Sequence, residues 1–183
     1  MAAKPQVKGL AFLGILKAAE RLHGAPVLEA IKKELPAPLT GLLVTGNWYP
    51  IDLYRELLTV TSKVLGHGPS AIRAVSREAT LQDFRGIYRV LTFVLSPEFL
   101  MKRAPGMFNR YYDTGKLQIL EARDGLVRAE YTECAGFNRL MWEDVIGGSA
   151  GVLQACGGRD IQVHIARGGS DDDAHLQIDA TWT

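Results

Sequence analysis

The spacing of the apolar residues changes at Gly115, and this change limits the fold more than any other feature of the chain. Before Gly115 they recur every three to four positions, which is the helical period. The clearest segment is 51–65, where Pro50 precedes the first turn and Gly66 follows the last. One face of that segment carries Leu53, Leu57, Val60 and Val64. Helices are predicted over 10–22, 27–35, 51–65, 71–79 and 81–95.

After Gly115 the apolar residues alternate with polar ones, which is the period of a half-buried strand. Segments 116–122 and 126–132 are joined by Arg123-Asp124-Gly125, and Asp-Gly favours a tight hairpin turn. Segments 159–166 and 175–181 alternate in the same way. Strands with one buried and one wet face are typical of antiparallel sheets. The fold class is therefore α+β, with an N-terminal helical layer packed on a C-terminal antiparallel sheet that is interrupted by one glycine-rich helix.

The 183 residues suit a single domain over 1–183, with a helical part over about 7–113 and a sheet with one helix over about 116–182. A net charge of +1 gives no global field for nucleic acid. No apolar run reaches the length that spans a bilayer, and two cysteines are too few for a disulfide framework. We expect a cytoplasmic protein with no transmembrane segment and no nucleic-acid partner.

Arginines four residues apart form two basic stripes on the predicted helices, Arg73 with Arg77 and Arg85 with Arg89. Such stripes are typical of a solvated helix face. An anion or partner patch is the alternative.

Gly147-Gly148-Ser149-Ala150-Gly151 matches Gly-x-Ser-x-Gly, the nucleophile elbow of serine hydrolases. That elbow follows a buried strand, and the adjacent carboxylates Glu143 and Asp144 suit such a strand poorly. A helix over 138–155 explains the segment better, with glycines that let its backbone approach a neighbour, here the sheet. We expect no enzyme; a small serine hydrolase that uses Ser149 is the alternative.

The four histidines are candidate metal ligands. His23 and His67 lie beside glycines at predicted helix ends, where imidazole can cap carbonyl groups. His164 lies opposite His175 or Gln177, depending on register, with Asp179 further along. Solvated strand residues are the commoner arrangement, and no nucleotide or dinucleotide fingerprint occurs. No metal site and no cofactor are predicted.

Aromatic and sulfur-containing side chains concentrate where the helical half meets the sheet, and such residues line adaptable apolar sites. A plain core is the alternative. The candidate ligand or partner residues are Phe93, Phe99, Met101, Phe108, Tyr111, Tyr112, Phe137, Met141 and Trp142.

A known family shares these patterns. Residues 96–115 (SPEFLMKRAPGMFNRYYDTG) precede a hairpin, a segment ending in Ala155-Cys156-Gly157-Gly158, Ile161-Gln162-Val163-His164 and a closing Thr181-Trp182. This order resembles the 4-vinyl-reductase domain, which belongs with the haem-nitric-oxide-binding sensors and the Bet3-type transport-particle subunits in one superfamily. The first half, with Val7-Lys8-Gly9 and Trp48-Tyr49-Pro50, is similar to an uncharacterised bacterial family of about this length.

The resemblance implies a homodimeric sensor or scaffold domain in signalling or regulation. Such a domain binds a partner protein, a small apolar ligand or both, and does not catalyse. Haem-binding members carry Tyr-x-Ser-x-Arg and a proximal helical histidine, but this chain lacks that motif and has no histidine between His67 and His164. Zinc-binding relatives place cysteines around the last hairpin, where this chain has Ser170, Asp173 and Ala174. The resemblance therefore implies neither haem nor zinc here.

Overall fold

The computed structural model describes residues 4–41, 43–86, 96–171 and 173–183. Phe93, Arg89 and the rest of the predicted 81–95 helix beyond Gly86 lie outside these ranges. The described chain has a helical half followed by an antiparallel sheet with one long helix inserted, so the predicted α+β class is confirmed. Its helices include none with the length and apolarity to cross a membrane.

The helical half contains α1 (Gly9–His23), α2 (Ala25–Glu34), α3 (Ala37–Thr40) and α4 (Ile51–Leu65). The bounds of α4 match the prediction because its ends are marked: Pro50 precedes it, and Gly66 closes it with a φ of 71°, in the left-handed region. Of the predicted stripe, Leu57 and Val60 are buried, and Leu53 and Val64 are half-buried. The buried residues of α4 are Ile51, Tyr54, Leu57, Leu58, Val60 and Thr61.

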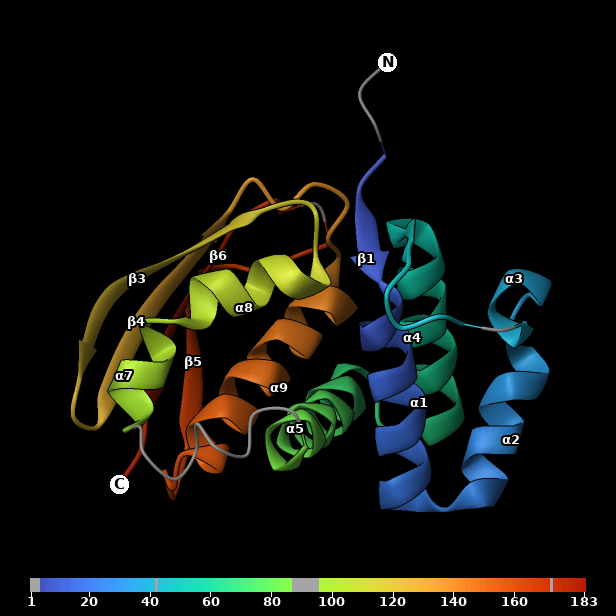
Figure 1. The fold of residues 1–183 in the computed structure, drawn as a ribbon, viewed down its shortest axis with the longest axis horizontal. Helices are drawn as coiled ribbons and strands as arrows, with labels where there is room; N and C mark the ends of the chain where they lie inside the picture. The colour runs from blue at the N-terminus through green and yellow to red at the C-terminus, as the bar shows by residue number, and fades with distance from the viewer. Residues whose placement is uncertain (1–3, 42, 87–95, 172) are drawn as a thin grey trace.

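A small two-stranded sheet was not predicted from the sequence. β1 (Gln6–Lys8) pairs antiparallel with β2 (Trp48–Pro50) beside α4 (Figure 1). Strands of three residues are too short to show a period of two, and each is followed at once by a helix. β1 also reaches the other half of the chain, because Val7 forms a β-bridge with Tyr112.

One helix, α5 (Pro69–Arg85), spans the helix predicted over 71–79 and the first residues of the one predicted over 81–95. The separation at residue 80 was wrong because Thr80 continues the helix without a break. α5 lies between α1 on one side and α9 (Arg139–Ala155) on the other, and so connects the helical half to the sheet half (Figure 1).

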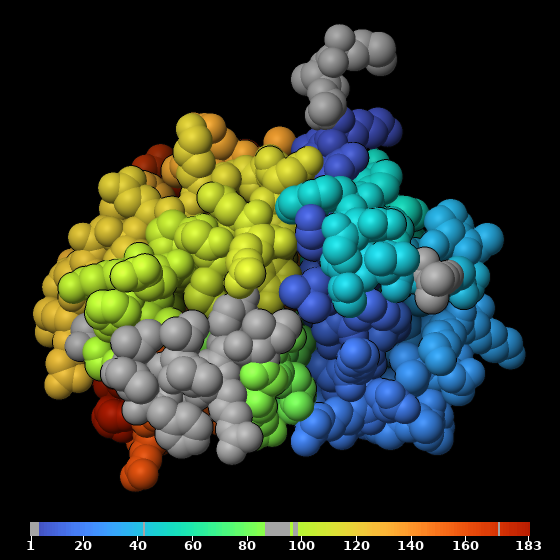
Figure 2. All heavy atoms as spheres, viewed as in Figure 1, coloured from blue at the N-terminus to red at the C-terminus, as the bar shows by residue number. Residues whose placement is uncertain are grey.

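After α7 (Pro97–Met101) and α8 (Ala104–Tyr111) comes a four-stranded antiparallel sheet in the order β3-β4-β6-β5. Its strands are β3 (Lys116–Arg123), β4 (Leu126–Thr132), β5 (Gln162–Gly168) and β6 (Leu176–Thr181). The predicted hairpin turn is present, and Gly125 adopts a φ of 74° that only glycine reaches without strain. Figure 2 shows α8 next to the segments of α1 and β2 on one face of the molecule.

The glycine-rich helix α9 matches the predicted segment 138–155 closely, and the Asn138 side chain caps it by accepting from the Met141 N–H at 3.1 Å. It is buried on nearly every side, since it packs between the sheet and α5. The expectation that its glycines approach the sheet was wrong. A Cβ at Gly147 would lie 2.3 Å from the Arg73 carbonyl oxygen, and one at Gly151 would lie 2.7 Å from Thr80 Cβ, so the close neighbour is α5.

Candidate functional site

A cavity of about 130 Å³ lies between the helical half and the sheet. Its wall takes residues from α1, α4, α5 and α8, from β3 and β4, and from α9. Most of the lining is apolar, and aromatic rings are prominent in it. The aromatic residues that line the cavity are Tyr54, Phe84, Phe108, Tyr111, Tyr112 and Tyr131.

A carboxylate, Asp144, stands in this wall and is only 9% exposed. Three hydroxyl groups donate to it. The Tyr54 and Tyr112 hydroxyls reach Oδ2 at 2.9 and 2.5 Å, and the Ser76 hydroxyl reaches Oδ1 at 2.5 Å. Buried polar groups require hydrogen-bond partners, and this carboxylate has three.

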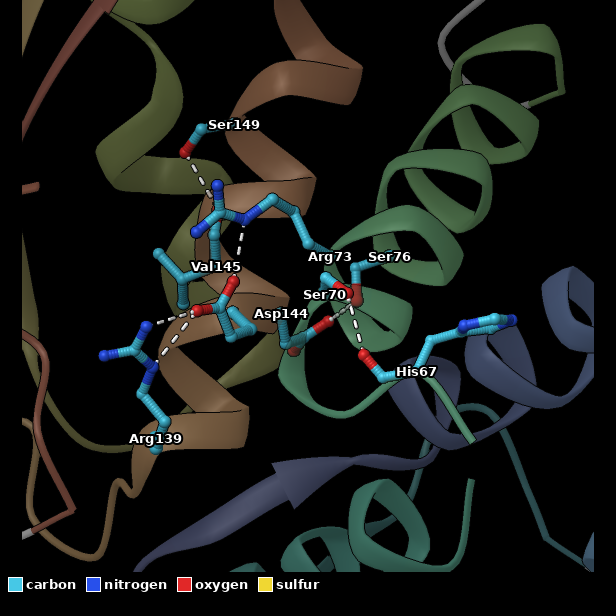
Figure 3. A network of polar contacts seen from close by, with 9 residues as sticks. His67, Ser70, Arg73, Ser76, Arg139, Asp144, Val145 and Ser149 are labelled. Carbon is cyan, nitrogen blue, oxygen red and sulfur yellow. Dashed lines mark hydrogen bonds and ion pairs between the residues drawn. The ribbon is translucent and has the colours of Figure 1, made fainter. Parts of the chain in front are cut away.

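Each donor comes from a different element, so the carboxylate joins four parts of the fold. Tyr54 belongs to the buried face of α4, Ser76 to α5, and Tyr112 directly follows α8. The Val7 bridge fixes the backbone of Tyr112 in turn. Figure 3 shows Asp144 pointing from α9 toward Ser76 on α5.

Burial shifts the pKa of this carboxyl group. Desolvation raises the pKa of Asp144, while the hydrogen bonds from Ser76, Tyr112 and Tyr54 oppose that rise. Burial and then the negative charge of Asp144 raise the pKa values of Tyr54 and Tyr112 well above their ordinary range. The two phenols therefore stay protonated and act as donors.

A second carboxylate, Asp83, also lines the cavity and accepts from the Tyr111 hydroxyl at 2.6 Å. It is half-buried, and desolvation raises its pKa, opposed by Tyr111 and by Lys17. Within the described part of the chain, the lining includes these two acids and no lysine, arginine or histidine.

The candidate residues from the sequence divide into four groups. Phe108, Tyr111 and Tyr112 line the cavity. Met101, Phe137, Met141 and Trp142 are buried in the core and do not line it, and Phe99 is 41% exposed beside the guanidinium of Arg103. Phe93 lies outside the described residues.

Sequence reasoning missed the polar part of the wall. Glu143 and Asp144 were considered only as obstacles to a buried strand. A signal was available, because a helix that carries Met141, Val145 and Val152 on its apolar stripe places Asp144 among buried positions. A buried carboxylate needs hydrogen-bond donors, but the sequence alone does not show that Tyr54 and Ser76 are those donors.

Glu143, the neighbour of Asp144, has a different role. It accepts from Arg73 Nε at 2.7 Å and from Arg139 Nε at 3.1 Å, so its charge is paired. Arg77 donates to Gln154 at 2.7 Å. The first basic stripe therefore joins α5 to α9 instead of forming a simple solvated face; Arg89 of the second stripe lies outside the described residues.

Ser149 lies inside α9 and is not placed as a nucleophile. Its hydroxyl donates to the Val145 carbonyl oxygen at 2.9 Å (Figure 3). It also lies 3.2 Å from the Tyr131 hydroxyl. A catalytic serine needs an imidazole in hydrogen-bond reach, and neither partner is one. Nothing in this geometry supports the serine hydrolase alternative.

The histidines lie apart from the cavity. The predicted register was wrong: His164 pairs with Asp179, because the hairpin closes with Gly168 opposite Leu176 and His164 lies four positions before Gly168. His175 Nε2 lies 3.3 Å from Glu130 Oε1. Over residues 4–41, 43–86, 96–171 and 173–183, no three histidine, cysteine or carboxylate side chains gather as metal ligands would.

Comparisons with known proteins give a structural result only. No protein-family model matches the chain, and no curated protein matches it. An oxygen-binding H-NOX domain related to soluble guanylate cyclases matches with a TM-score of 0.70 and 15% identity over 96% of this chain and 95% of that one. An Fe(II) unliganded H-NOX protein from K. algicida matches with a TM-score of 0.71 and 11% identity over 96% of each chain.

Identities this low show shared architecture and not shared ligands. The 4-vinyl-reductase and Bet3-type parts of the resemblance, and the bacterial family, stay predictions. The part that named haem-nitric-oxide-binding sensors is confirmed at the level of structure: the chain has the fold of H-NOX domains.

Proposed function

We propose that the chain is a non-enzymatic sensor domain that binds a small, largely apolar ligand in the cavity between its two halves. The observation that carries this proposal is the placement of Asp144, which sits in an aromatic wall and is bonded to residues of α4, α5 and the end of α8. A ligand there contacts elements of both halves at once. A shift in their packing is a suitable signal to a partner protein.

The shared fold raises the question of haem, since one of the matching structures concerns haem distortion in the H-NOX family. The residues of this cavity do not fit that group. A volume of about 130 Å³ suits a molecule of about benzene size, and a porphyrin is several times larger. None of the four histidines lines the cavity.

Of the other described lining residues, Tyr54, Tyr112, Tyr131 and Met107 are poor replacements for a proximal histidine. Tyrosine ligates haem iron as a phenolate. Burial raises the pKa of Tyr131 to about 12 and those of Tyr54 and Tyr112 well above the ordinary value. Met107 also lines the cavity, but methionine ligates cytochrome haem together with a histidine.

We therefore expect protein purified from haem-supplemented cells to be colourless. Absorption spectroscopy tests this expectation. A stoichiometric Soret band that survives gel filtration, and that moves when a single histidine or tyrosine is replaced, would contradict it.

Ligand binding itself is tested by thermal unfolding in the presence of small aromatic molecules. A ligand at about 100 times its dissociation constant stabilises the fold by about 2.7 kcal/mol. Gly148→Leu offers a blocked variant, because Gly148 lines the cavity and a Cβ there meets Thr80 Oγ1 only at 3.4 Å. We expect this variant to fold but to show no increase in thermal stability on addition of the ligand. If the increase persists in the variant, the ligand binds outside the cavity.

The remaining parts of the proposal come from the resemblance. It predicts a homodimer and a protein partner in signalling or regulation, and both stay predictions. Phe99 and Leu120 are 41% and 46% exposed on α7 and β3, two elements that contact each other. Exposed apolar residues on neighbouring elements support the prediction that this side of the molecule associates.

A further inference from the structure

The ionisable groups that carry charge in the described lining of the cavity are all acidic. Asp144 and Asp83 line it, and the described lining contains no basic side chain. All three partners of Asp144 are neutral hydroxyl groups. The neighbouring carboxylate of Glu143, by contrast, is paired with two guanidinium groups.

A buried carboxylate without a counter-ion is costly, because hydrogen bonds from hydroxyls replace only part of its hydration. A carboxylate has about four lone-pair sites, and three hydrogen bonds leave about one free. That free site belongs to a group that lines the cavity. A cation in the cavity would gain both the hydrogen bond and the charge interaction.

The aromatic rings around Asp144 suit the same kind of ligand. The Tyr54 and Tyr112 rings lie 6.4 Å apart, and Phe108 lies 4.9 Å from Tyr112. Aromatic faces attract organic cations and also pack against their apolar parts, which is how aromatic cages hold alkylammonium groups. In the described lining an anion would meet two acids and no base.

Building on the proposed function, which places a ligand in this cavity, we propose that the ligand is a small organic cation. It is a protonated amine or quaternary ammonium of about six to eight non-hydrogen atoms. Its charged group contacts the Asp144 carboxylate, and its apolar body contacts the rings of Tyr54, Phe108 and Tyr112. Asp83, the more exposed acid, adds attraction from a second point of the wall.

The test is a charge series of equal size on the wild-type chain: benzylamine, benzyl alcohol, toluene and benzoate. Binding is measured by calorimetry and by chemical-shift changes at neutral pH and low ionic strength. We expect benzylamine to bind about tenfold tighter than benzyl alcohol or toluene, or more, which corresponds to about 1.4 kcal/mol. Benzoate should bind weakest.

Three variants show which residue causes the preference for a cation. Asp144→Asn keeps the shape and removes the charge, so benzylamine and benzyl alcohol should then bind about equally. Glu143→Gln is the matched control, since it makes the same change one position away on a carboxylate that does not line the cavity. It should leave the preference intact. Asp83→Asn should reduce the preference partly.

The outcomes separate the two proposals. If toluene or benzyl alcohol binds as tightly as benzylamine to the wild type, the proposal of a cationic ligand is contradicted, whereas the proposal that the cavity binds a ligand is supported. If benzoate binds best, the cation is again wrong. If none of the four compounds binds, both proposals fail. Because the series is measured on the wild type, a variant that does not fold leaves the decision unaffected.

Discussion

Gly147→Ala is expected to lower the free energy of unfolding by about 1 to 3 kcal/mol, although alanine favours helix by about 1 kcal/mol. The added Cβ would lie 2.3 Å from the Arg73 carbonyl oxygen and 3.0 Å from Arg73 Cα. Both are backbone atoms of α5, so the clash cannot be relieved by turning a side chain. Urea unfolding followed by circular dichroism measures the change.

Gly148→Ala is the matched control in the same helix. Its Cβ would meet Thr80 Oγ1 at 3.4 Å, an ordinary contact. We expect no loss, and a gain of up to about 1 kcal/mol from helix propensity. Equal effects at 147 and 148 would show that α5 is not held against α9 at this distance.

Asp144→Ala is expected to cost about 2 to 4 kcal/mol, because it leaves the hydroxyls of Tyr54, Tyr112 and Ser76 without their acceptor. Asp144→Asn should cost less, since its amide still offers an oxygen acceptor. The two variants also differ from the wild type in how stability depends on pH, because neither can lose a proton at residue 144.

The direction of that dependence follows from the raised pKa of Asp144 in the folded state. Between the unfolded value of about 3.9 and the raised native value, the native state holds more protons than the unfolded chain. The free energy of unfolding of the wild type therefore falls relative to Asp144→Asn as pH rises through this window. Groups common to both proteins, such as Asp83, cancel in the difference. An advantage of the wild type that grows with pH would mean that the hydroxyl donors outweigh desolvation.

Much of the fold could be predicted because the relevant signals are local. Pro50 and Gly66 mark the ends of α4, and Asp124-Gly125 marks the hairpin. The β1 and β2 pairing could not be predicted, because its two strands are three residues long and lie far apart in the chain. The position of α5 against Gly147 and Gly151 was missed for a related reason. Glycines in a helix indicate that another element packs closely against it, but they do not show which element that is.

The site was predictable only in its apolar part. Residue type pointed to the region of Phe108, Tyr111 and Tyr112, but it could not distinguish cavity from core, and Trp142 packs in the core. The role of Asp144 depends on its hydrogen bonds with Tyr54 and Ser76, which are 90 and 68 positions away in the sequence. Spacing along one helix cannot show which other helices face it.

The bridge between Val7 and Tyr112 also bears on the order in which the chain assembles. The Gln6 N–H donates to Asp113 Oδ1 at 2.6 Å across 107 positions, and the Asp113 N–H donates back to Gln6. Contacts between such distant positions require closure of a long loop and slow folding. β1 is synthesised before its partner beyond α8 and can form this bridge only when that partner is present. We therefore expect Tyr112 to reach its final position only after the two ends of this loop have met, so that the pocket is completed late in folding.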